Sequence, residues 1–313
     1  MCAARAVAAA HAAVDVGSNS VRLLVHGADG QRLTREMTVT RLGTGVDRTG
    51  RLDDEALART LATIAAYRAQ WEGLGVRDRV RIAATSAVRD AADRERFFAG
   101  VREVAGVDAE VLTGAEEAAL AFLGATAAVD VPRPAAVIDI GGGSTEVVLG
   151  TEHGAQAGAS VQLGCVRLTE RHLQADPPDL AQLHAGRAMV GARLDEVDVQ
   201  LAAAGWRVAD AVALVAVAGT ATTLGALHLG LDTYEESLIH GARIPASSLG
   251  ALTDRLVAMT SAQRAALGPM QPGREDVIHG GALVLAATVE RYGFDEVVVS
   301  EADSLDGLAA SLA

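Results

Sequence analysis

Short apolar runs and longer amphipathic runs alternate along the first third of the chain, which predicts strands and helices in turn. Residues 12–27 read as a strand, a tight turn and a second strand, and residues 31–42 as a third strand. A helix begins at Asp53, where acidic residues suit the positive helix N-terminus, and its apolar face continues through Trp71. Residues 80–91 predict a buried strand that runs into a polar loop.

The pattern stops at a proline-containing segment and then starts again. Val129–Pro134 carries two prolines and is the best candidate for a linker. Before it we expect a helix at about 92–105, a strand at 108–113 and a helix at about 115–128. After it we expect a strand, a glycine turn at 141–143, a strand, a strand around 160–168, a helix at about 178–204, a strand at 211–219 and a turn leading into a helix. This predicts two α/β domains, 1–131 and 132–313, with packing of the last helix on the first domain left open.

Two matching segments support this repetition. "DVGSNSVRLLV" at 15–25 and "DIGGGSTEVVL" at 139–149 share an aspartate, a glycine two residues later, small polar residues and a strand. Glycine lets the backbone approach a ligand closely, and successive N–H groups then form an anion-binding concavity. The aspartate before each turn would repel a bare phosphate, so it indicates a divalent cation such as Mg²⁺. A glycine-rich hairpin without a ligand is the alternative for either loop alone.

Composition narrows the choice of ligand and location. The 313 residues are half apolar and 21% charged, which is typical of a globular protein with room for two domains. A net charge of −13 disfavours nucleic acid and anionic membranes as partners, so an anionic ligand needs a local site or a metal. The cysteines, Cys2 and Cys165, form no disulfide framework. The N-terminal run "MCAARAVAAAHAAVDVG" is too weakly apolar for a leader, and we expect a cytoplasmic protein.

The absence of lysine excludes several classes of enzyme. All 27 basic residues are arginine. A Walker A loop, the protein-kinase fold with its strand lysine, and Schiff-base chemistry all require lysine. The eight histidines also lack the spacing of a metal site.

The motifs together resemble a known group of proteins. Paired Asp-x-Gly loops and a late Gly-Thr turn resemble the superfamily of actin, heat-shock chaperones and sugar kinases. More narrowly, the chain resembles the exopolyphosphatase and guanosine pentaphosphate phosphatase (Ppx/GppA) family. The segments that carry the resemblance are "DVGSNSVRLLV" (15–25), "ATSAVRDA" (84–91), "LTGAEEAALAFLGA" (112–125), "VIDIGGGSTEVVLG" (137–150), "SVQLGCVRLTE" (160–170), "VAGTATTLGAL" (217–227) and "GREDVIHGGALVL" (273–285). The resemblance implies an α/β fold of two ribonuclease-H-like (actin-like ATPase) domains with an interdomain cleft.

The same resemblance implies roles for individual residues. Glu117 is the implied general base, with Glu116 as its competitor and a helix-start role as the structural alternative for both. Asp139 and Glu146 are the implied ligands of Mg²⁺ or Mn²⁺, with Asp15 as a third. The implied phosphate-binding residues are Gly17, Ser18, Asn19, Ser20, Arg22, Ser86, Arg89, Gly141, Gly142, Gly143, Ser144 and Thr145.

The sequence also departs from the family pattern. The late turn is Ala218-Gly219-Thr220 where Gly-Gly-Thr is usual, which puts tight nucleotide contact in doubt, and Glu275 stands where a small residue is more common. The chain ends before the helical C-terminal module of longer members could begin, so we expect a short two-domain form.

These features predict metal-dependent hydrolysis of the terminal phosphate of inorganic polyphosphate. Hydrolysis of guanosine pentaphosphate at its 5′-triphosphate is the close alternative, since both substrates end in a phosphoanhydride. A sugar kinase or chaperone-like ATPase, and a non-catalytic sensor of guanosine tetraphosphate, are the alternatives from other classes. A homodimer is the expected assembly.

Overall fold

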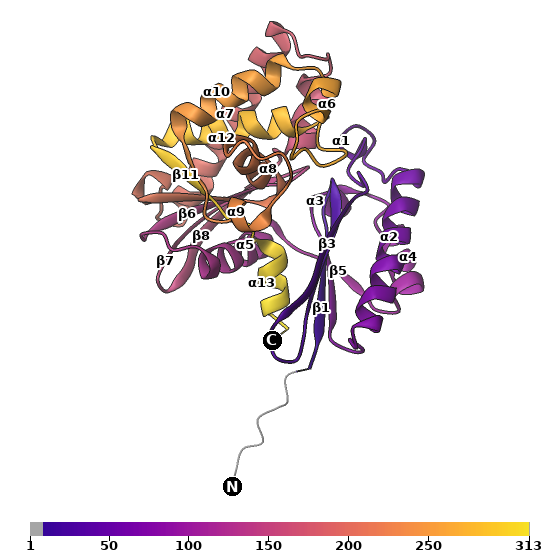
Figure 1. The fold of residues 1–313 in the computed structure, drawn as a ribbon. Coiled ribbons are helices and arrows are strands. Elements are labelled where there is room, and N and C mark those ends of the chain that lie inside the picture. The colour runs from indigo at the N-terminus through magenta and orange to yellow at the C-terminus, as the bar shows by residue number, and fades with distance from the viewer. Residues whose placement is uncertain (1–8, 313) are drawn as a thin grey trace. The chain divides into compact units, whose positions relative to one another are not determined.

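The computed structural model describes residues 9–312, which divide into two compact units (Figure 1). Unit 1 holds the described residues up to Leu112 together with those from Leu305 onward, and unit 2 is Thr113–Ser304. The chain thus passes between the units at 112/113 and again at 304/305, whereas the sequence places a single boundary at 131/132; that domain assignment stays a prediction. The question of a leader falls on residues 1–8, outside the described residues.

Unit 1 is built on a five-stranded mixed sheet in the order β3-β2-β1-β4-β5. The first three strands form an antiparallel meander, and β4 and β5 extend the sheet parallel to β1. The strands are β1 (His11–Val16), β2 (Ser20–His26), β3 (Arg32–Val39), β4 (Val80–Ala84) and β5 (Ala109–Val111). The predicted strand–turn–strand at 12–27 and the third strand are confirmed.

Helices cover both faces of this sheet. On one face, α2 (Asp54–Gly73) and α4 (Glu95–Ala105) bury Ile64, Trp71 and Phe97 against the strands. Asp53 begins α2 by accepting a hydrogen bond from the N–H of Ala56 at 2.9 Å, because the first N–H groups of a helix lack partners of their own. The last helix of the chain contacts β3 on the other face through Asp306. The helices of unit 1 are completed by α1 (Val46–Thr49), α3 (Ser86–Asp90) and α13 (Ser304–Ala310).

Helices α13 and α3 test two of the sequence predictions. Arg35 of β3 donates to both carboxylate oxygens of Asp306 in α13 at 2.9 Å, which ties α13 to unit 1. The polar loop predicted after β4 was wrong, because residues Ser86–Asp90 form α3. A helix of five residues is too short to show a helical period in the sequence.

Unit 2 repeats the sheet of unit 1. Its order is β10-β11-β9-β6-β7-β8, in which β6, β7 and β8 form an antiparallel meander and β9 and β11 run parallel to β6. Apart from the edge strand β10, this is the strand order of unit 1. The strands are β6 (Ala135–Ile140), β7 (Thr145–Thr151), β8 (Gly154–Val161), β9 (Ala213–Val217), β10 (Arg243–Pro245) and β11 (Glu296–Val299). The predicted α/β class and the predicted repetition are confirmed.

The two faces of the second sheet carry different helices. Alternate residues of β6, such as Ile138, point into a large core with most of the helices, whereas Val137 points toward α5 (Gly114–Ala128) alone. The helices of the large core are α6 (Cys165–His172), α7 (Leu180–Ala203), α8 (Ala218–His228), α10 (Ala246–Ala258) and α12 (Ile278–Tyr292). The remaining short helices are η1 (Val208–Asp210), α9 (Glu236–Ile239) and α11 (Ser261–Ala265).

Two sequence predictions in unit 2 were wrong. The strand expected around 160–168 ends at Val161, and α6 follows it. The turn expected after β9 is the first turn of α8, which begins at Ala218. At 160–168 alternating apolar residues imitate a strand, and at 219–226 glycines and threonines imitate a turn. The start of α6 is stabilised by carbonyl groups of Gly141 and Gly142, which lie far away in the sequence.

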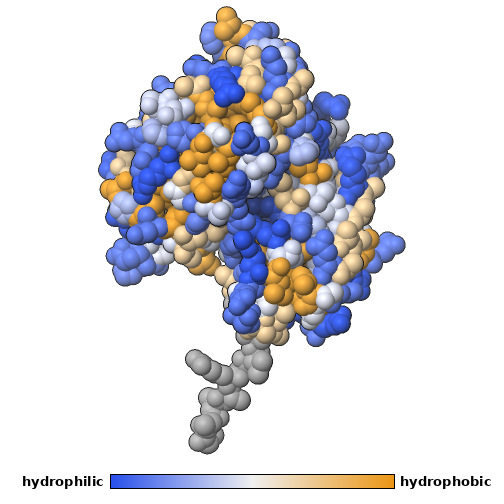
Figure 2. Space-filling view, viewed as in Figure 1, coloured by the Kyte–Doolittle hydropathy of each residue, from blue (hydrophilic) through white to orange (hydrophobic). Residues whose placement is uncertain are grey.

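The surface carries scattered apolar side chains between hydrophilic ones, as Figure 2 shows for one face. The most exposed large ones include Leu180, Val199 and Val212. Across residues 9–312 we find no helix with both the length and the apolar character that a bilayer crossing demands.

We predict that the α7 face in the large core contributes strongly to stability. Leu201 is 0% exposed and Leu180, on the same helix, is 74% exposed. Leu201→Ala should lower the free energy of unfolding by about 2–5 kcal/mol, because it removes buried methyl groups and leaves a cavity. Leu180→Ala should change it by less than about 0.5 kcal/mol. Urea denaturation measures both, and equal effects would contradict the assignment of the buried face.

Candidate active site

The glycine loop between β6 and β7 turns its carbonyl groups toward α6. The carbonyl oxygens of Gly141 and Gly142 accept hydrogen bonds from the first three N–H groups of α6, Cys165–Arg167, with N···O distances of 2.9 to 3.1 Å. The carbonyl oxygen of Gly143 accepts from the side-chain Nε of Arg167 at 2.7 Å. Three consecutive acceptors of the loop are therefore satisfied on one side.

The N–H groups of the same peptides point to the other side, because a trans peptide directs its C=O and N–H in opposite directions. These are the N–H groups of Gly142, Gly143 and Ser144, and none of them donates to an acceptor within residues 9–312. All three residues are buried, and buried N–H groups are almost always hydrogen-bonded in native proteins. The loop thus offers three adjacent backbone donors to a ligand or to water, an arrangement that suits an anion.

The loop at 17–20 in unit 1 has the same construction. The carbonyl oxygens of Ser18 and Asn19 accept from the N–H groups of Thr40, Arg41 and Gly43 at 2.7 to 3.0 Å. The N–H groups of Ser18 and Asn19 have no acceptor in the described part of the chain. The side-chain amide of Asn19 is buried and likewise has no hydrogen-bond partner there. Both predicted phosphate loops therefore present buried donors on one side.

A glycine lies directly behind each loop. A Cβ atom on Gly43 would lie 2.7 Å from Ser18 Cβ, and a Cβ atom on Gly164 would lie 2.3 Å from the carbonyl carbon and oxygen of Gly142. Real Cβ atoms do not approach so closely, so any larger residue would displace the loop. Neither glycine was among the predicted site residues. Their sequence signal is a glycine 25 to 28 residues after each loop aspartate.

Two of the predicted metal ligands face each other directly. Asp139 on β6 and Glu146 on β7 are cross-strand partners, and their side chains lie on the α5 face of the sheet. Both are buried, and the Ser160 hydroxyl donates to Glu146 Oε1 at 2.7 Å. Two negatively charged side chains on neighbouring strands repel each other, so this pair favours a cation between or beside the carboxylates.

The matching position in unit 1 holds an opposite pair. Asp15 on β1 has Arg22 on β2 as its cross-strand partner, and the two form an ion pair. The predicted third metal ligand and a predicted phosphate-binding arginine thus contact each other within unit 1. No group of three histidine, cysteine or acidic side chains that could hold a metal occurs among the described residues. The three-carboxylate ligand set stays a prediction.

The structure gives the two adjacent glutamates of α5 different surroundings. Glu116 accepts hydrogen bonds from the N–H and the hydroxyl of Thr113, each at 2.8 Å, and completes a capping box at the helix start. Glu117 is only 7% exposed. A Cβ atom on Gly114 would lie 2.3 Å from Ser160 Cβ, so the first turn of α5 packs beside the serine that binds Glu146. Glu117 and the carboxylate pair therefore share one face and one end of unit 2.

Other predicted residues already make contacts within the protein. The Ser86 hydroxyl lies 2.9 Å from the Ser18 hydroxyl, so α3 contacts the first loop. Arg89 donates to the carbonyl of Leu112 at 2.9 Å. The Thr145 hydroxyl donates to the carbonyl of Leu163, which directs it away from a ligand on the N–H side of the loop.

The model of the Ppx/GppA phosphatase family matches residues 24–313. The chain belongs to the Ppx/GppA family. The predicted resemblance is confirmed.

Similar members of the family span nearly the whole chain. Exopolyphosphatase 2 of Mycobacterium tuberculosis is 45% identical over 96% of this chain and 98% of its own length. The crystal structure of an exopolyphosphatase-like protein superposes with a TM-score of 0.91 at 36% identity, covering 96% of this chain and 98% of that one. The crystal structure of an exopolyphosphatase from Cytophaga hutchinsonii superposes with a TM-score of 0.85 at 26% identity, covering 97% of both chains.

In this Ppx/GppA protein a further buried arginine, Arg274, packs against the first turn of α8. The Arg274 guanidinium occupies the place where a Cβ atom of Gly219 would stand, within 2.0 Å of it, so a larger residue at 219 would require the guanidinium to move. Ala218 before it adopts a φ of 62°, which is rare for a residue with a side chain. Burial raises the pKa of the nearby Cys165 thiol although the positive charge of Arg274 acts in the opposite direction, so this thiol stays neutral. Sequence reasoning noted Glu275 but missed Arg274.

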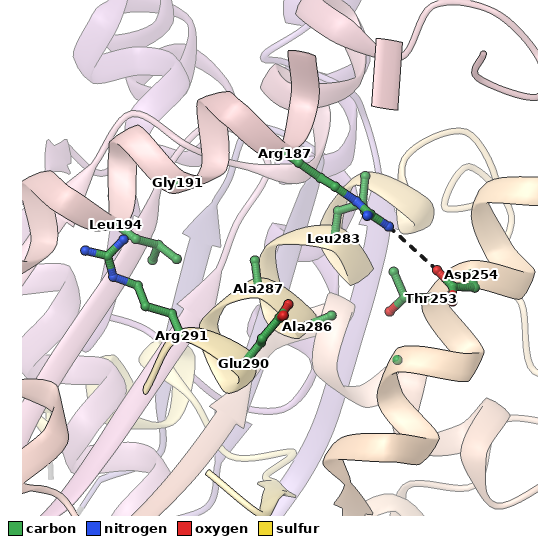
Figure 3. Close-up of a pocket in the computed structure, with 11 residues that line it drawn as sticks. Arg187, Gly191, Leu194, Thr253, Asp254, Leu283, Ala286, Ala287, Glu290 and Arg291 are labelled. Carbon is green, nitrogen blue, oxygen red and sulfur yellow. Dashed lines mark ion pairs between the residues drawn. The ribbon is translucent and has the colours of Figure 1, made fainter. Parts of the chain in front are cut away.

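A separate cavity lies on the helical layer of unit 2 and contains none of the predicted site residues. Its volume is about 410 Å³, and it lies among α7, α10 and α12 (Figure 3). Arg187 and Asp254 form an ion pair of 3.7 Å across it, and Gly191 contributes to its wall. These residues provide control positions in unit 2 that lie outside the glycine loop.

We predict that the glycine behind the second loop is required for loop geometry. Gly164→Ala should lower the free energy of unfolding by about 1–3 kcal/mol, because the new methyl group overlaps the Gly142 peptide. Gly191→Ala is the matched control, since a Cβ atom there meets nothing within 4 Å and the helix gains about 0.5–1 kcal/mol from alanine. Urea denaturation of both variants checks this, and a Gly164→Ala protein as stable as the wild type would contradict it.

Proposed function

We propose that this chain is an exopolyphosphatase, which hydrolyses the terminal phosphoanhydride bond of inorganic polyphosphate. The observation that carries the proposal is the polarity of the two loops, each of which turns its carbonyls into the protein and leaves buried N–H groups for a ligand. The 45% identity to a protein named exopolyphosphatase supports the same substrate class.

The residues of the site supply what the reaction requires. Phosphoanhydride hydrolysis needs a held phosphoryl group, stabilisation of its negative charge and an oriented water, with no covalent intermediate on the protein. The N–H groups of the two loops would bind phosphate oxygens. Glu117 would accept the proton of the attacking water as general base.

Glu116 is less suited to that role than Glu117. Its carboxylate already accepts two hydrogen bonds from Thr113 and stabilises the helix start. A base engaged in this way would have to give up the cap before it could orient water. The assignment of Glu117 as the base therefore fits the capping role of Glu116 and the burial of Glu117.

The donor set near the second loop fits a hard divalent cation. Asp139 and Glu146 offer carboxylate oxygens on the same face, and Mg²⁺ typically takes one or two carboxylates together with water and phosphate oxygens. These two residues would hold Mg²⁺ or Mn²⁺, with Asp15 as a third ligand. The bound cation supplies neutralisation of phosphate charge.

A phosphate-release assay tests the proposed function against its alternatives. The substrates are short polyphosphate, long polyphosphate, guanosine pentaphosphate and ATP, each with and without Mg²⁺. Release from polyphosphate supports the proposal. Release from guanosine pentaphosphate alone would mean that the enzyme hydrolyses a phosphoanhydride bond, as proposed, but in a different substrate. ADP formation from ATP in the presence of sugars would indicate a kinase, and no release from any substrate would overturn the proposal in favour of a sensor. The homodimer and the cytoplasmic location stay predictions.

We predict that activity depends on the carboxylate pair and on a divalent cation. Excess chelator should abolish phosphate release. Asp139→Asn should lose activity without unfolding, because it removes one of the two carboxylates proposed to bind the cation. Circular dichroism confirms the fold. Asp254→Asn, an exposed carboxylate on α10, is the control and should keep full activity. Full activity of the wild type in excess chelator would refute the metal requirement.

We predict that Glu117 governs the rate and not the binding. Glu117→Gln should lower kcat by roughly 10²- to 10⁴-fold, the usual contribution of a general base, with little change in the binding of polyphosphate. Glu116→Gln should keep activity, since glutamine can also complete a capping box. Steady-state kinetics and direct binding separate the two effects. Loss of activity in Glu116→Gln with activity retained in Glu117→Gln would exchange the two roles.

A further inference from the structure

Arg167 lies in the first turn of α6, directly behind the glycine loop of unit 2. Arg167 is only 8% exposed, which is unusual for a residue with a charged side chain. Its Nε donates to the carbonyl oxygen of Gly143 at 2.7 Å, and its backbone N–H donates to the carbonyl oxygen of Gly142 at 3.1 Å. One residue thus contacts two successive peptides of the loop.

The glycine loop needs such contacts because its own backbone is permissive. Glycine adopts positive and negative φ about equally well, so a peptide that borders a glycine can change its direction more readily than one between two residues with side chains. A turned peptide would exchange its N–H for its C=O on the ligand side. A carbonyl oxygen there would repel a phosphate where an N–H would bind it.

The backbone of α6 holds the first two peptides but does not reach the third. The N–H groups of Cys165, Val166 and Arg167 are all taken by the carbonyls of Gly141 and Gly142. The Gly143 carbonyl accepts only from the Arg167 side chain, as far as residues 9–312 are concerned. The direction of the Gly143–Ser144 peptide therefore depends on a single side chain.

We propose that Arg167 is a positioning residue, which directs the Ser144 N–H toward the terminal phosphate by binding the carbonyl on the opposite side of the same peptide. The proposal rests on the proposed function, in which this loop binds phosphate. Donation from a guanidinium to the carbonyl also polarises the peptide, so the N–H becomes a stronger donor. Arg167 itself does not contact the substrate.

The kinetic test compares three variants. Arg167→Met keeps the length of the side chain and removes its donors, and should lower kcat/KM for polyphosphate by ~10- to 100-fold, the worth of one hydrogen bond to a charged group. Arg167→Lys keeps a donor and should recover a large part of this loss. Arg187→Met, in the cavity of α7, should stay within about twofold of the wild type. A purely structural role would lower thermal stability without this rescue of kcat/KM by lysine.

The sequence offers a direct spectroscopic readout of the peptide. Gly17–Ser18 and Gly143–Ser144 are the only Gly–Ser pairs in the 313 residues, and one lies in each loop. Protein labelled with ¹³C at glycine carbonyls and ¹⁵N at serine therefore gives two signals in a carbonyl-selected amide spectrum. The Ser18 signal is an internal control for the Ser144 signal.

The expected result is a shift of the Ser144 signal in unliganded Arg167→Met, with the Ser18 signal unchanged. Addition of tripolyphosphate should shift the Ser144 signal in the wild type and in Arg167→Lys, and much less in Arg167→Met. A Ser144 signal of Arg167→Met that coincides with that of the wild type would overturn the proposal. If Arg167→Met does not fold, Arg167→Leu takes its place, because leucine also lacks a donor, and a Ser144 signal of Arg167→Leu that coincides with that of the wild type would overturn the proposal equally.

Phosphate binding by the loop and positioning of the peptide by Arg167 are tested by different signals. If tripolyphosphate shifts neither signal in the wild type, the loop does not bind phosphate and the proposed function fails. The shift of the unliganded Ser144 signal in Arg167→Met still reports whether Arg167 sets the direction of the peptide.

Discussion

Each of the two predicted phosphate loops depends on hydrogen bonds that engage its carbonyl oxygens on one side. A loop can offer N–H groups to an anion only if the carbonyls of the same peptides have partners elsewhere, because both groups are costly to bury alone. In unit 2 the N-terminus of α6 and the Arg167 side chain supply those partners, and in unit 1 the N–H groups of residues 40, 41 and 43 do so. The contact is close enough that Gly43 and Gly164 leave no room for a Cβ atom.

The two halves of the chain share a fold but differ in charge at one position. Asp15 and Asp139 occupy equivalent places on equivalent strands, yet the cross-strand partner is Arg22 in one unit and Glu146 in the other. In unit 1 the aspartate is neutralised by the arginine. In unit 2 the two carboxylates face each other on the side of α5. A repeated scaffold thus gives one ion pair and one pair of acids, and the acidic pair is the one suited to a cation.

Helix α5 links this pair to the proposed base. Thr113 and Glu116 form the capping box that fixes where the helix begins, and Gly114 allows that end to pack against Ser160. Because Ser160 also binds Glu146, the start of α5 lies beside the carboxylate pair. Glu117 is the next residue along and is carried into a buried position by the same turn. Two adjacent glutamates thereby acquire different surroundings, Glu116 in the helix cap and Glu117, the proposed base, in a buried position.

The sequence by itself determined the α/β class, the repetition and most of the strands, because these depend on local periodicity and on glycine turns that a chain shows directly. It also singled out Asp139 and Glu146, since carboxylates next to such turns are chemically conspicuous, whereas Glu117 was indicated only by the resemblance to the family. Only the tertiary structure decided that residues 165–172 form α6 and not a strand, because that helix is stabilised by carbonyl groups from a loop 24 residues earlier, such as that of Gly143. It alone placed Arg22 against Asp15, Arg274 over Gly219 and Arg167 behind the loop. Contacts of this kind join residues that are distant in sequence, and no local pattern records them.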